Sequence, residues 1–154
     1  MKESDLNTII NNSFKEIGFS HKISDPIGGY GIQNPFDGFS VIKDKNIYWE
    51  TKLIKNEYGS FNFNKIEEHQ IKALTQIKNE NKNNICLILV GYYIPRKLFE
   101  VFTFDIELVN ELRNKGKNSL FKKEIMLYKD KAVKISKKKL DCSLLLDNII
   151  KEFK

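Results

Sequence analysis

A run of apolar residues that does not alternate with polar ones, residues 85–92, limits the possible folds of this chain more than any other feature. A strand with one wet face alternates apolar and polar residues, whereas a central strand covered on both faces reads as a continuous apolar run. Such a strand needs neighbours along both edges and a layer on each face. The sequence therefore predicts a sheet between layers of helices.

The flanking segments supply those neighbours. Period-2 patterns and turn residues predict strands, and apolar residues at helical spacing predict helices. We expect the second helix to begin at Asn64, because Glu67 three residues later completes a capping-box pattern. The predicted strands are 19–23, 36–43, 47–54, 85–92 and 98–104, with a small hairpin of 125–128 and 132–135, and the predicted helices are 5–17, 64–79, 105–113 and 140–153.

The order of these elements is typical of an α/β fold with a mixed central β-sheet flanked by helices. A chain of 154 residues has the common size of one domain, and it carries no internal repeat or linker. We expect a single domain over residues 1–154.

The first residues, from Met1 to Asp5, are charged where a secretory signal would be apolar. The apolar run is also far shorter than the roughly 20 residues that cross a membrane. We expect a cytoplasmic protein with no membrane partner. Cys86 and Cys142 lack the spacing of a zinc site and are expected to be inert buried thiols.

Positive charge is concentrated in residues 111–139. This segment holds eleven Lys or Arg against three acidic residues, a balance of +8 within a net charge of +6, so the remainder carries −2. A basic segment on a near-neutral body favours a nucleic-acid partner, although a solvated lysine-rich face would look similar. The lysines expected to contact DNA are Lys115, Lys117, Lys122 and Lys123.

The predicted hairpin of residues 36–54 carries the residues with the clearest chemistry. Strand alternation places Glu50 and Lys52 side by side on a face opposite the apolar one, and Asp37 lies on the partner strand. Two carboxylates able to bind Mg²⁺ or Mn²⁺ beside an ammonium are the groups that phosphodiester hydrolysis requires. The alternative is an ordinary surface hairpin with a Glu and a Lys on its wet face.

Gln70 interrupts the apolar stripe of the second predicted helix, one turn from Ile66 and from Leu74. A polar side chain that faces inward needs a partner, and Glu50, a metal-bound water or a phosphate would each supply one. A satisfied core amide is the alternative. We place His69 beside it on the helix surface or near DNA rather than at a metal.

Six short segments, in this order and spacing, resemble the RecU-type Holliday junction resolvases. They are Glu3 to Asn7, Pro35 to Gly38, Tyr48 to Lys52, Phe61 and Phe63, His69-Gln70, and Gly116 to Leu120. The resemblance covers nearly the whole chain. It implies a restriction-endonuclease-like PD-(D/E)xK core and a homodimer that nicks four-way DNA junctions with Mg²⁺ or Mn²⁺. By this resemblance Asp37, Glu50 and Glu3 bind metal, Lys52 assists the nucleophile, and Gln70 lies close to the active centre.

The chain also departs from that family. RecU-type enzymes carry a long stalk before the catalytic Asp, where this chain has only residues 24–34. Position 51 is Thr where the family commonly has a small Ala, a change on the core face that is not expected to affect cleavage. A nuclease acting on linear or other branched DNA, and a non-catalytic DNA-binding module, therefore stand as alternatives.

Overall fold

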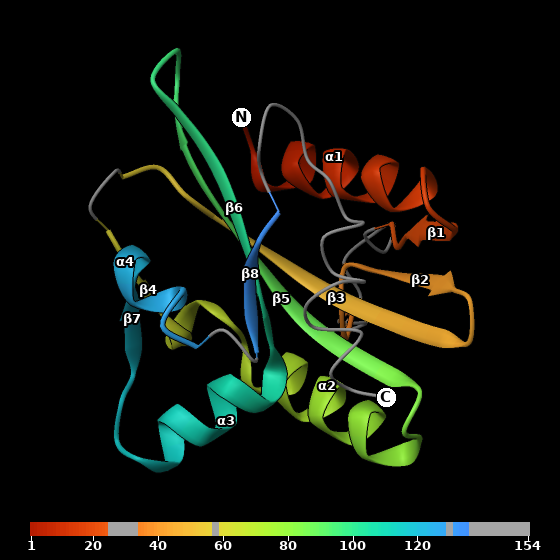
Figure 1. Ribbon diagram of the computed structural model, residues 1–154. Helices are drawn as coiled ribbons and strands as arrows, with labels where there is room; N and C mark the ends of the chain where they lie inside the picture. The colour runs from red at the N-terminus through yellow and green to blue at the C-terminus, as the bar shows by residue number, and fades with distance from the viewer. Residues whose placement is uncertain (25–33, 57–58, 129–130, 136–154) are drawn as a thin grey trace.

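The computed structural model describes residues 1–24, 34–56, 59–128 and 131–135. A six-stranded sheet in the order β1-β2-β3-β5-β6-β8 forms its centre, with a two-stranded sheet of β4 and β7 to one side (Figure 1). The strands are β1 (Phe19–Lys22), β2 (Gly38–Ile42), β3 (Lys45–Ile54), β4 (Ser60–Asn62), β5 (Asn84–Ile94), β6 (Leu98–Asp105), β7 (Ser119–Phe121) and β8 (Ala132–Lys134). The helices are α1 (Glu3–Lys15), the 3₁₀ turn η1 (Phe63–Lys65), α2 (Glu68–Glu80), α3 (Ile106–Asn114) and α4 (Lys122–Ile125).

The sheet is mixed, because β3 and β5 run parallel while the other neighbouring strands pair antiparallel. Strand β5 lies inside it, and its residues divide between two buried clusters. Ile85, Leu87 and Leu89 join the cluster that contains the apolar residues of α1, whereas Cys86 and Ile88 join the one that contains those of α2 and α3. The predicted mixed sheet between helices is confirmed (Figure 1).

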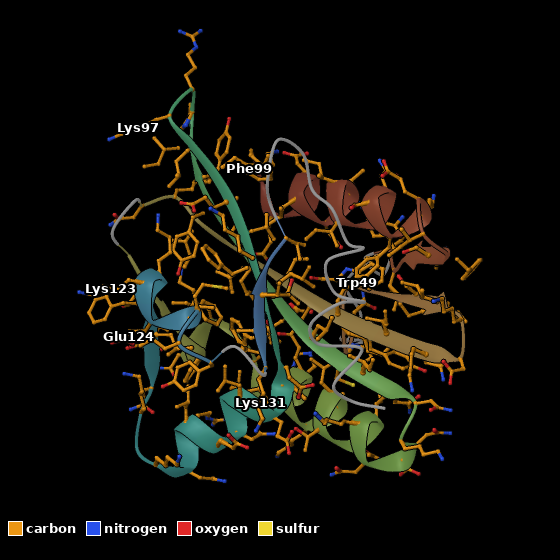
Figure 2. The ribbon with its side chains drawn as sticks, in the orientation of Figure 1. Trp49, Lys97, Phe99, Lys123, Glu124 and Lys131 are labelled. Carbon is orange, nitrogen blue, oxygen red and sulfur yellow. The ribbon has the colours of Figure 1, made fainter. Side chains whose placement is uncertain are left out.

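The hairpin of β2 and β3 is set by a close fit between two residues. Gly38 pairs with Trp49, and a Cβ at position 38 would lie 2.2 Å from the Trp49 ring. Trp49 is fully buried against Phe14 of α1, with ring centroids 4.9 Å apart, and donates its indole N–H to Asn7 Oδ1 at 3.1 Å (Figure 2). This packing fixes α1 on the sheet and the register that brings Asp37 opposite β3.

The N-cap of helix α2 lies three residues later than the sequence predicts, at Glu67 instead of Asn64. Asn64 lies within the 3₁₀ turn η1, and Ile66 is extended with φ −92° and ψ 121°, so the helix cannot start there. The N-cap is Glu67, and the capping box uses Gln70. A short hydrogen bond from Asn64 N to Asn62 Oδ1, 2.9 Å long, stabilises the turn instead.

The predicted small hairpin of residues 125–128 and 132–135 is wrong. Ile125 ends the short helix α4, and Ala132 to Lys134 pair with β6 at the edge of the main sheet. Hydrogen bonding to an existing strand satisfies β8 better than an isolated hairpin would. The predicted helix 140–153 lies outside the described residues, as does most of the interval 24–34.

Strands β5 and β6 continue past the rest of the sheet as a projecting hairpin with Lys97 at its tip (Figures 1 and 2). Arg96 turns this tip with a positive φ of 61°. None of the described helices is long and apolar enough to cross a membrane.

Candidate active site

Glu50 is a carboxylate in the interior of the protein. Strand alternation directs its side chain to the α2 face of β3, where it is 1% exposed. Oε1 accepts a hydrogen bond from Gln70 Nε2 at 2.9 Å and lies 2.8 Å from Lys52 Nζ. Oε2 is buried and has no hydrogen-bond partner among the described residues. The face of β3 that carries Glu50 is therefore covered by α2, and the alternative of an ordinary surface hairpin with a wet face is excluded.

Burial and charge change the acidity of this pair. Burial, and after it the negative charge of Asp37, raises the pKa of the Glu50 carboxyl from its ordinary value of 4.5 to about 8. Burial disfavours the Lys52 ammonium, but Glu50 and then Glu3 outweigh it and hold the pKa of Lys52 above its ordinary range. With a pKa of about 8, the Glu50 carboxyl is largely protonated near neutral pH. A cation that binds to this carboxyl would displace the proton.

Gln70 uses both ends of its amide. Its Nε2 donates to Glu50, and its Oε1 accepts a hydrogen bond from Glu67 N at 3.1 Å, which caps α2. The expected inward-facing amide with Glu50 as its partner is what the structure contains. Gln70 therefore has two roles that explain a polar residue in the apolar stripe: it caps α2, and it binds the Glu50 carboxyl group.

Glu3 reaches the site from the first turn of α1. Its Oε1 lies 3.8 Å from Lys52 Nζ, and its Oε2 accepts a hydrogen bond from Leu53 N at 3.3 Å. Lys52, which is 8% exposed, is held between Glu50 and Glu3. Contacts with both acidic side chains restrict the position of the ammonium.

Asp37 precedes β2 and turns its side chain to the adjacent strand. Its Oδ2 accepts two hydrogen bonds from Thr51, one from the backbone N–H at 2.8 Å and one from the hydroxyl at 2.7 Å. The strand pattern places Thr51 on the core face and gives no sign of this contact. Only the register of the hairpin, which the sequence does not show, reveals it.

A cavity of about 370 Å³ opens beside these residues. Its walls include Glu3, Asp37, Thr51 and also Lys22 of β1, which sequence reasoning missed. Lys22 Nζ donates to Thr8 Oγ1 at 3.0 Å. Glu50 and Lys52 are not among the described residues that line this cavity. The accessible part of the site is the side formed by α1, β1 and Asp37.

The oxygens left over fit a hard cation. Besides the buried Glu50 Oε2, Asp37 Oδ1 has no hydrogen bond among the described residues. A buried carboxylate oxygen without a partner is costly, and Mg²⁺ is commonly held by one or two carboxylates with water completing its shell. No cluster of three or more His, Cys, Asp or Glu able to hold a metal occurs in the described part of the chain. Asp37 and Glu50 thus fit as a pair, while Glu3 is engaged with Lys52.

His69 lies beside this site without entering it. Its Nδ1 is 3.1 Å from Glu67 Oε2, and its Nε2 is 3.2 Å from the Asn34 carbonyl oxygen. This position on the helix surface agrees with the prediction. Cys86 is buried and unpaired, and burial raises the pKa of its thiol to about 12, so it stays protonated. Cys142 lies outside the described residues.

The four lysines expected at DNA lie on and before α4. Lys117 Nζ is 3.2 Å from Glu124 Oε2, and Lys122 Nζ donates to Glu100 Oε1 at 2.7 Å. Lys115, the C-cap of α3, and Lys123 are both exposed, and Lys123 points away from the protein body (Figure 2). Other basic residues of this segment also pair with acids from elsewhere in the chain, as Arg113 does with Glu68. The surplus of +8 along the sequence is therefore smaller at the surface.

Comparison with known proteins shows the family of this chain. The model of the family described as RecU, Recombination protein U, matches residues 32–147, which is more than half of the chain. No curated protein matches the sequence. Among solved structures, the chain is similar to Hjc, a Holliday junction resolvase from the archaeal hyperthermophile Archaeoglobus fulgidus, with 15% identity and a TM-score of 0.39 over 69% of this chain and 77% of that one.

Proposed function

The chain belongs to the RecU family, and on this premise we propose that Asp37, Glu50 and Lys52 form the cleavage site of a Holliday junction resolvase. Resolvases of this family are metal-dependent endonucleases that bind branched DNA. The observation that carries the assignment of residues is the buried Glu50, whose Oε2 lacks a partner among the described residues while Lys52 and Gln70 hold its Oε1.

Each side chain has a distinct role in this proposal. Asp37 and Glu50 hold the cation, and Mg²⁺ or Mn²⁺ suits their oxygens. When bound, the cation activates water and polarises the phosphoryl oxygen. Lys52 stabilises the negative charge that develops on the phosphate, and Gln70 orients Glu50. Glu3 acts as an outer carboxylate that steadies Lys52 and adds negative charge to the cation site.

Cleavage of a labelled four-way junction tests this assignment. Wild-type protein should nick opposing strands with Mg²⁺ or Mn²⁺, while Asp37→Asn and Glu50→Gln should bind the junction without cutting it. Linear duplex of the same sequence is the substrate control, since equal cleavage of both would reassign the protein to general duplex DNA. The absence of paired nicking at every metal and pH tried would overturn the proposal.

The metal is identified by the same assay. Two carboxylates with water completing the shell favour Mg²⁺ or Mn²⁺ over Ca²⁺, which commonly takes about six to eight oxygens. We expect Ca²⁺ to allow junction binding without cleavage. Because DNA is the substrate, the proposed location of the protein is the cytoplasm.

We further propose that the active protein is a homodimer, since paired nicks in a four-way junction require two active sites. Sedimentation of the protein with and without junction should give the mass of two chains. A single chain bound to one junction, at concentrations that give paired nicks, would contradict the dimer.

Lys115, Lys117, Lys122 and Lys123 are proposed to bind phosphates of the DNA. Removing one such lysine–phosphate pair should make the slope of log affinity against log salt shallower by about 0.9. Lys115 and Lys123 are exposed, so their Ala variants should show this reduction. Lys122 is engaged with Glu100, and its Ala variant should change the slope less. A slope that is unchanged in all four variants would remove these lysines from the DNA interface.

A further inference from the structure

Thr51 follows Glu50 on β3 and contacts Asp37, which directly precedes the neighbouring strand β2. Its side chain is fully buried on the α1 face of β3. The hydroxyl donates to Asp37 Oδ2 at 2.7 Å, and the backbone N–H of the same residue donates to the same oxygen at 2.8 Å. Two donors from one residue thus converge on one carboxylate oxygen.

The backbone of Asp37 is already fixed. Its N–H donates to the Trp49 carbonyl oxygen at 2.8 Å, and its carbonyl oxygen accepts from Ile23 N at 2.8 Å. The freedom left to Asp37 is rotation of its side chain. Two hydrogen bonds on Oδ2 remove that freedom and leave Oδ1 without a hydrogen bond among the described residues.

A small Ala at position 51, which the RecU resemblance implies for related enzymes, would supply only the backbone donor. The hydroxyl here is an additional contact to Asp37, and it revises the expectation that Thr at position 51 has no effect on cleavage. Hydrogen-bonded partners that orient a metal ligand commonly change metal affinity or activity about 10- to 100-fold when removed. The Thr51 hydroxyl can therefore orient the Asp37 carboxylate as well as fill space in the core.

We propose that Thr51 is a positioning residue, whose hydroxyl fixes the Asp37 carboxylate so that Oδ1 stays available to a divalent cation. The proposal rests on the assignment of Asp37 as a metal ligand. In this proposal Thr51 acts through Asp37 and does not itself hold the cation.

The sheet contains a matched control in Thr103. Thr51 and Thr103 pair with the same residue, Leu89, from opposite sides of β5, and both are fully buried. The hydroxyl of Thr103 has no hydrogen-bond partner among the described residues. Val has nearly the same shape as Thr, so a Thr→Val change conserves packing at both positions. It removes a hydrogen bond to a carboxylate only at position 51.

Titration of DNA-free protein with Mn²⁺ tests the proposal. Thr51→Val should weaken Mn²⁺ binding by about 10-fold, the lower end for such partners because the backbone donor remains. Thr51→Ser keeps the hydroxyl and should bind like wild type, as should Thr103→Val. In cleavage assays Thr51→Val should need more Mn²⁺ for half-maximal rate while KM for the junction is unchanged.

Three results would overturn the proposal. These are unchanged Mn²⁺ affinity in Thr51→Val, equal losses in Thr51→Val and Thr103→Val, and failure of Thr51→Ser to retain binding. Equal losses in the two Val variants, or failure of Thr51→Ser, would mean that Thr51 only packs in the core. Thermal melting of each variant would measure that loss of packing as a lower melting temperature.

A second measurement needs neither metal nor DNA, so it separates this proposal from the proposed function. Crystal structures of metal-free wild type and Thr51→Val should show the Asp37 carboxylate held in one position in the first and rotated or spread over several in the second. The same carboxylate position in both would overturn the role of Thr51 even in an active resolvase. If wild type does not bind Mn²⁺ while the Asp37 carboxylate rotates as expected in Thr51→Val, the metal assignment alone would be overturned.

Discussion

Two buried carboxylates of the same sheet, Glu50 on β3 and Asp105 at the end of β6, have similar surroundings. Each is 1% exposed or less, each pairs with a lysine, and each has one oxygen without a hydrogen-bond partner among the described residues. Burial raises the pKa of both carboxyl groups above their ordinary values. In burial, in pairing with a lysine and in the direction of the pKa shift, the two residues are alike.

They differ in what their oxygens hold. Asp105 is the N-cap of α3, where its Oδ1 accepts from Glu107 N at 2.7 Å and also binds Lys78 of α2. Glu50 caps no helix, and its partners Lys52 and Gln70 are side chains that converge on it from β3 and α2. The charge of Asp37 also raises the pKa of Glu50. The burial of Asp105 is explained by its structural roles, which are to cap α3 and to join it to α2 through Lys78. Glu50 has no such role in the described part of the chain.

This difference is a guide to interpreting buried acids. A raised pKa identifies a desolvated carboxyl, and such carboxyls occur both in ion pairs that join helices and in active sites. The second carboxylate and the cavity beside it distinguish the site at Glu50 from the cap at Asp105. Changes made in parallel at the two positions should therefore separate activity from stability.

The largest expected effect is at Glu50. Glu50→Gln keeps the shape and a hydrogen bond to Lys52 but removes the charge that holds the cation, and should lower the rate of junction cleavage by about 10³-fold or more. Thermal melting should change little, which shows that the loss is chemical. A variant that retains wild-type cleavage would place Glu50 with Asp105 among the structural carboxylates.

The parallel change at Asp105 should act on stability. Asp105→Ala removes the cap of α3 and one partner of Lys78, and should lower the free energy of unfolding by about 3 kcal/mol. Denaturant titration measures this loss. At a temperature where the variant is folded, its cleavage rate per molecule should match that of wild type. A specific loss of cleavage would show that the two carboxylates are coupled.

Acidity gives the third test. The folded-state pKa of Glu50, about 8, exceeds its ordinary 4.5, so the folded protein binds an extra proton between these values. The stability that this proton contributes is complete below pH 4.5 and is lost as the pH rises to about 8. Metal-free wild type should therefore become less stable over this range, and Glu50→Gln should show a flatter dependence. Equal slopes in the two proteins would mean that Glu50 has an ordinary pKa.

The same proton competes with the cation. Below about pH 8, the apparent affinity for Mn²⁺ should rise about tenfold per pH unit, because one proton leaves as the cation binds. Titration calorimetry in buffers of different protonation enthalpy would count the released proton. Affinity that does not depend on pH between about 6 and 8 would contradict competition at Glu50.

The smallest effects belong to Gln70. Gln70→Leu removes the helix cap and the donor to Glu50, and should cost about 1 kcal/mol of stability as well as about 10-fold in cleavage rate. Gln70→Glu keeps an oxygen for the cap but repels Glu50, so it should lower cleavage with less loss of stability. If Gln70→Leu and Gln70→Glu lose equal stability and equal cleavage rate, the helix cap and the contact with Glu50 would not be separable effects of Gln70.

Much of the site was predictable because it is local in sequence. Alternation along one strand pairs Glu50 with Lys52, and the polar break at Gln70 indicates an inward-facing amide. The covered strand of residues 85–92 likewise predicts a sheet between helices. Each of these patterns depends on residues within one element, where the periods of strand and helix apply directly.

What the sequence could not predict depends on register and on distant pairs. The bond from Thr51 to Asp37 requires the alignment of Gly38 with Trp49. Asn64 has the residue pattern of an N-cap, but the 3₁₀ turn places Glu67 in that role. Local propensity is a weak signal that tertiary contacts override.

The basic segment illustrates the same limit for charge. Counting along residues 111–139 gives a strong surplus, yet Lys122 pairs with Glu100 of β6 and Arg113 with Glu68 of α2. These acids lie outside the segment in sequence and beside it in space. Net charge along a sequence is therefore a poor measure of the field at a surface.

The two bonds of Gln70 tie the start of α2 to the site. Helix ends open and close without unfolding the whole protein, and such local opening is among the least costly motions of a fold. When the first turn of α2 opens, Gln70 releases Glu67 and Glu50 together. Amide hydrogen exchange at the first turn of α2 thus reports how often Glu50 loses its amide donor, and a ligand that protects those amides would also hold Glu50 in place.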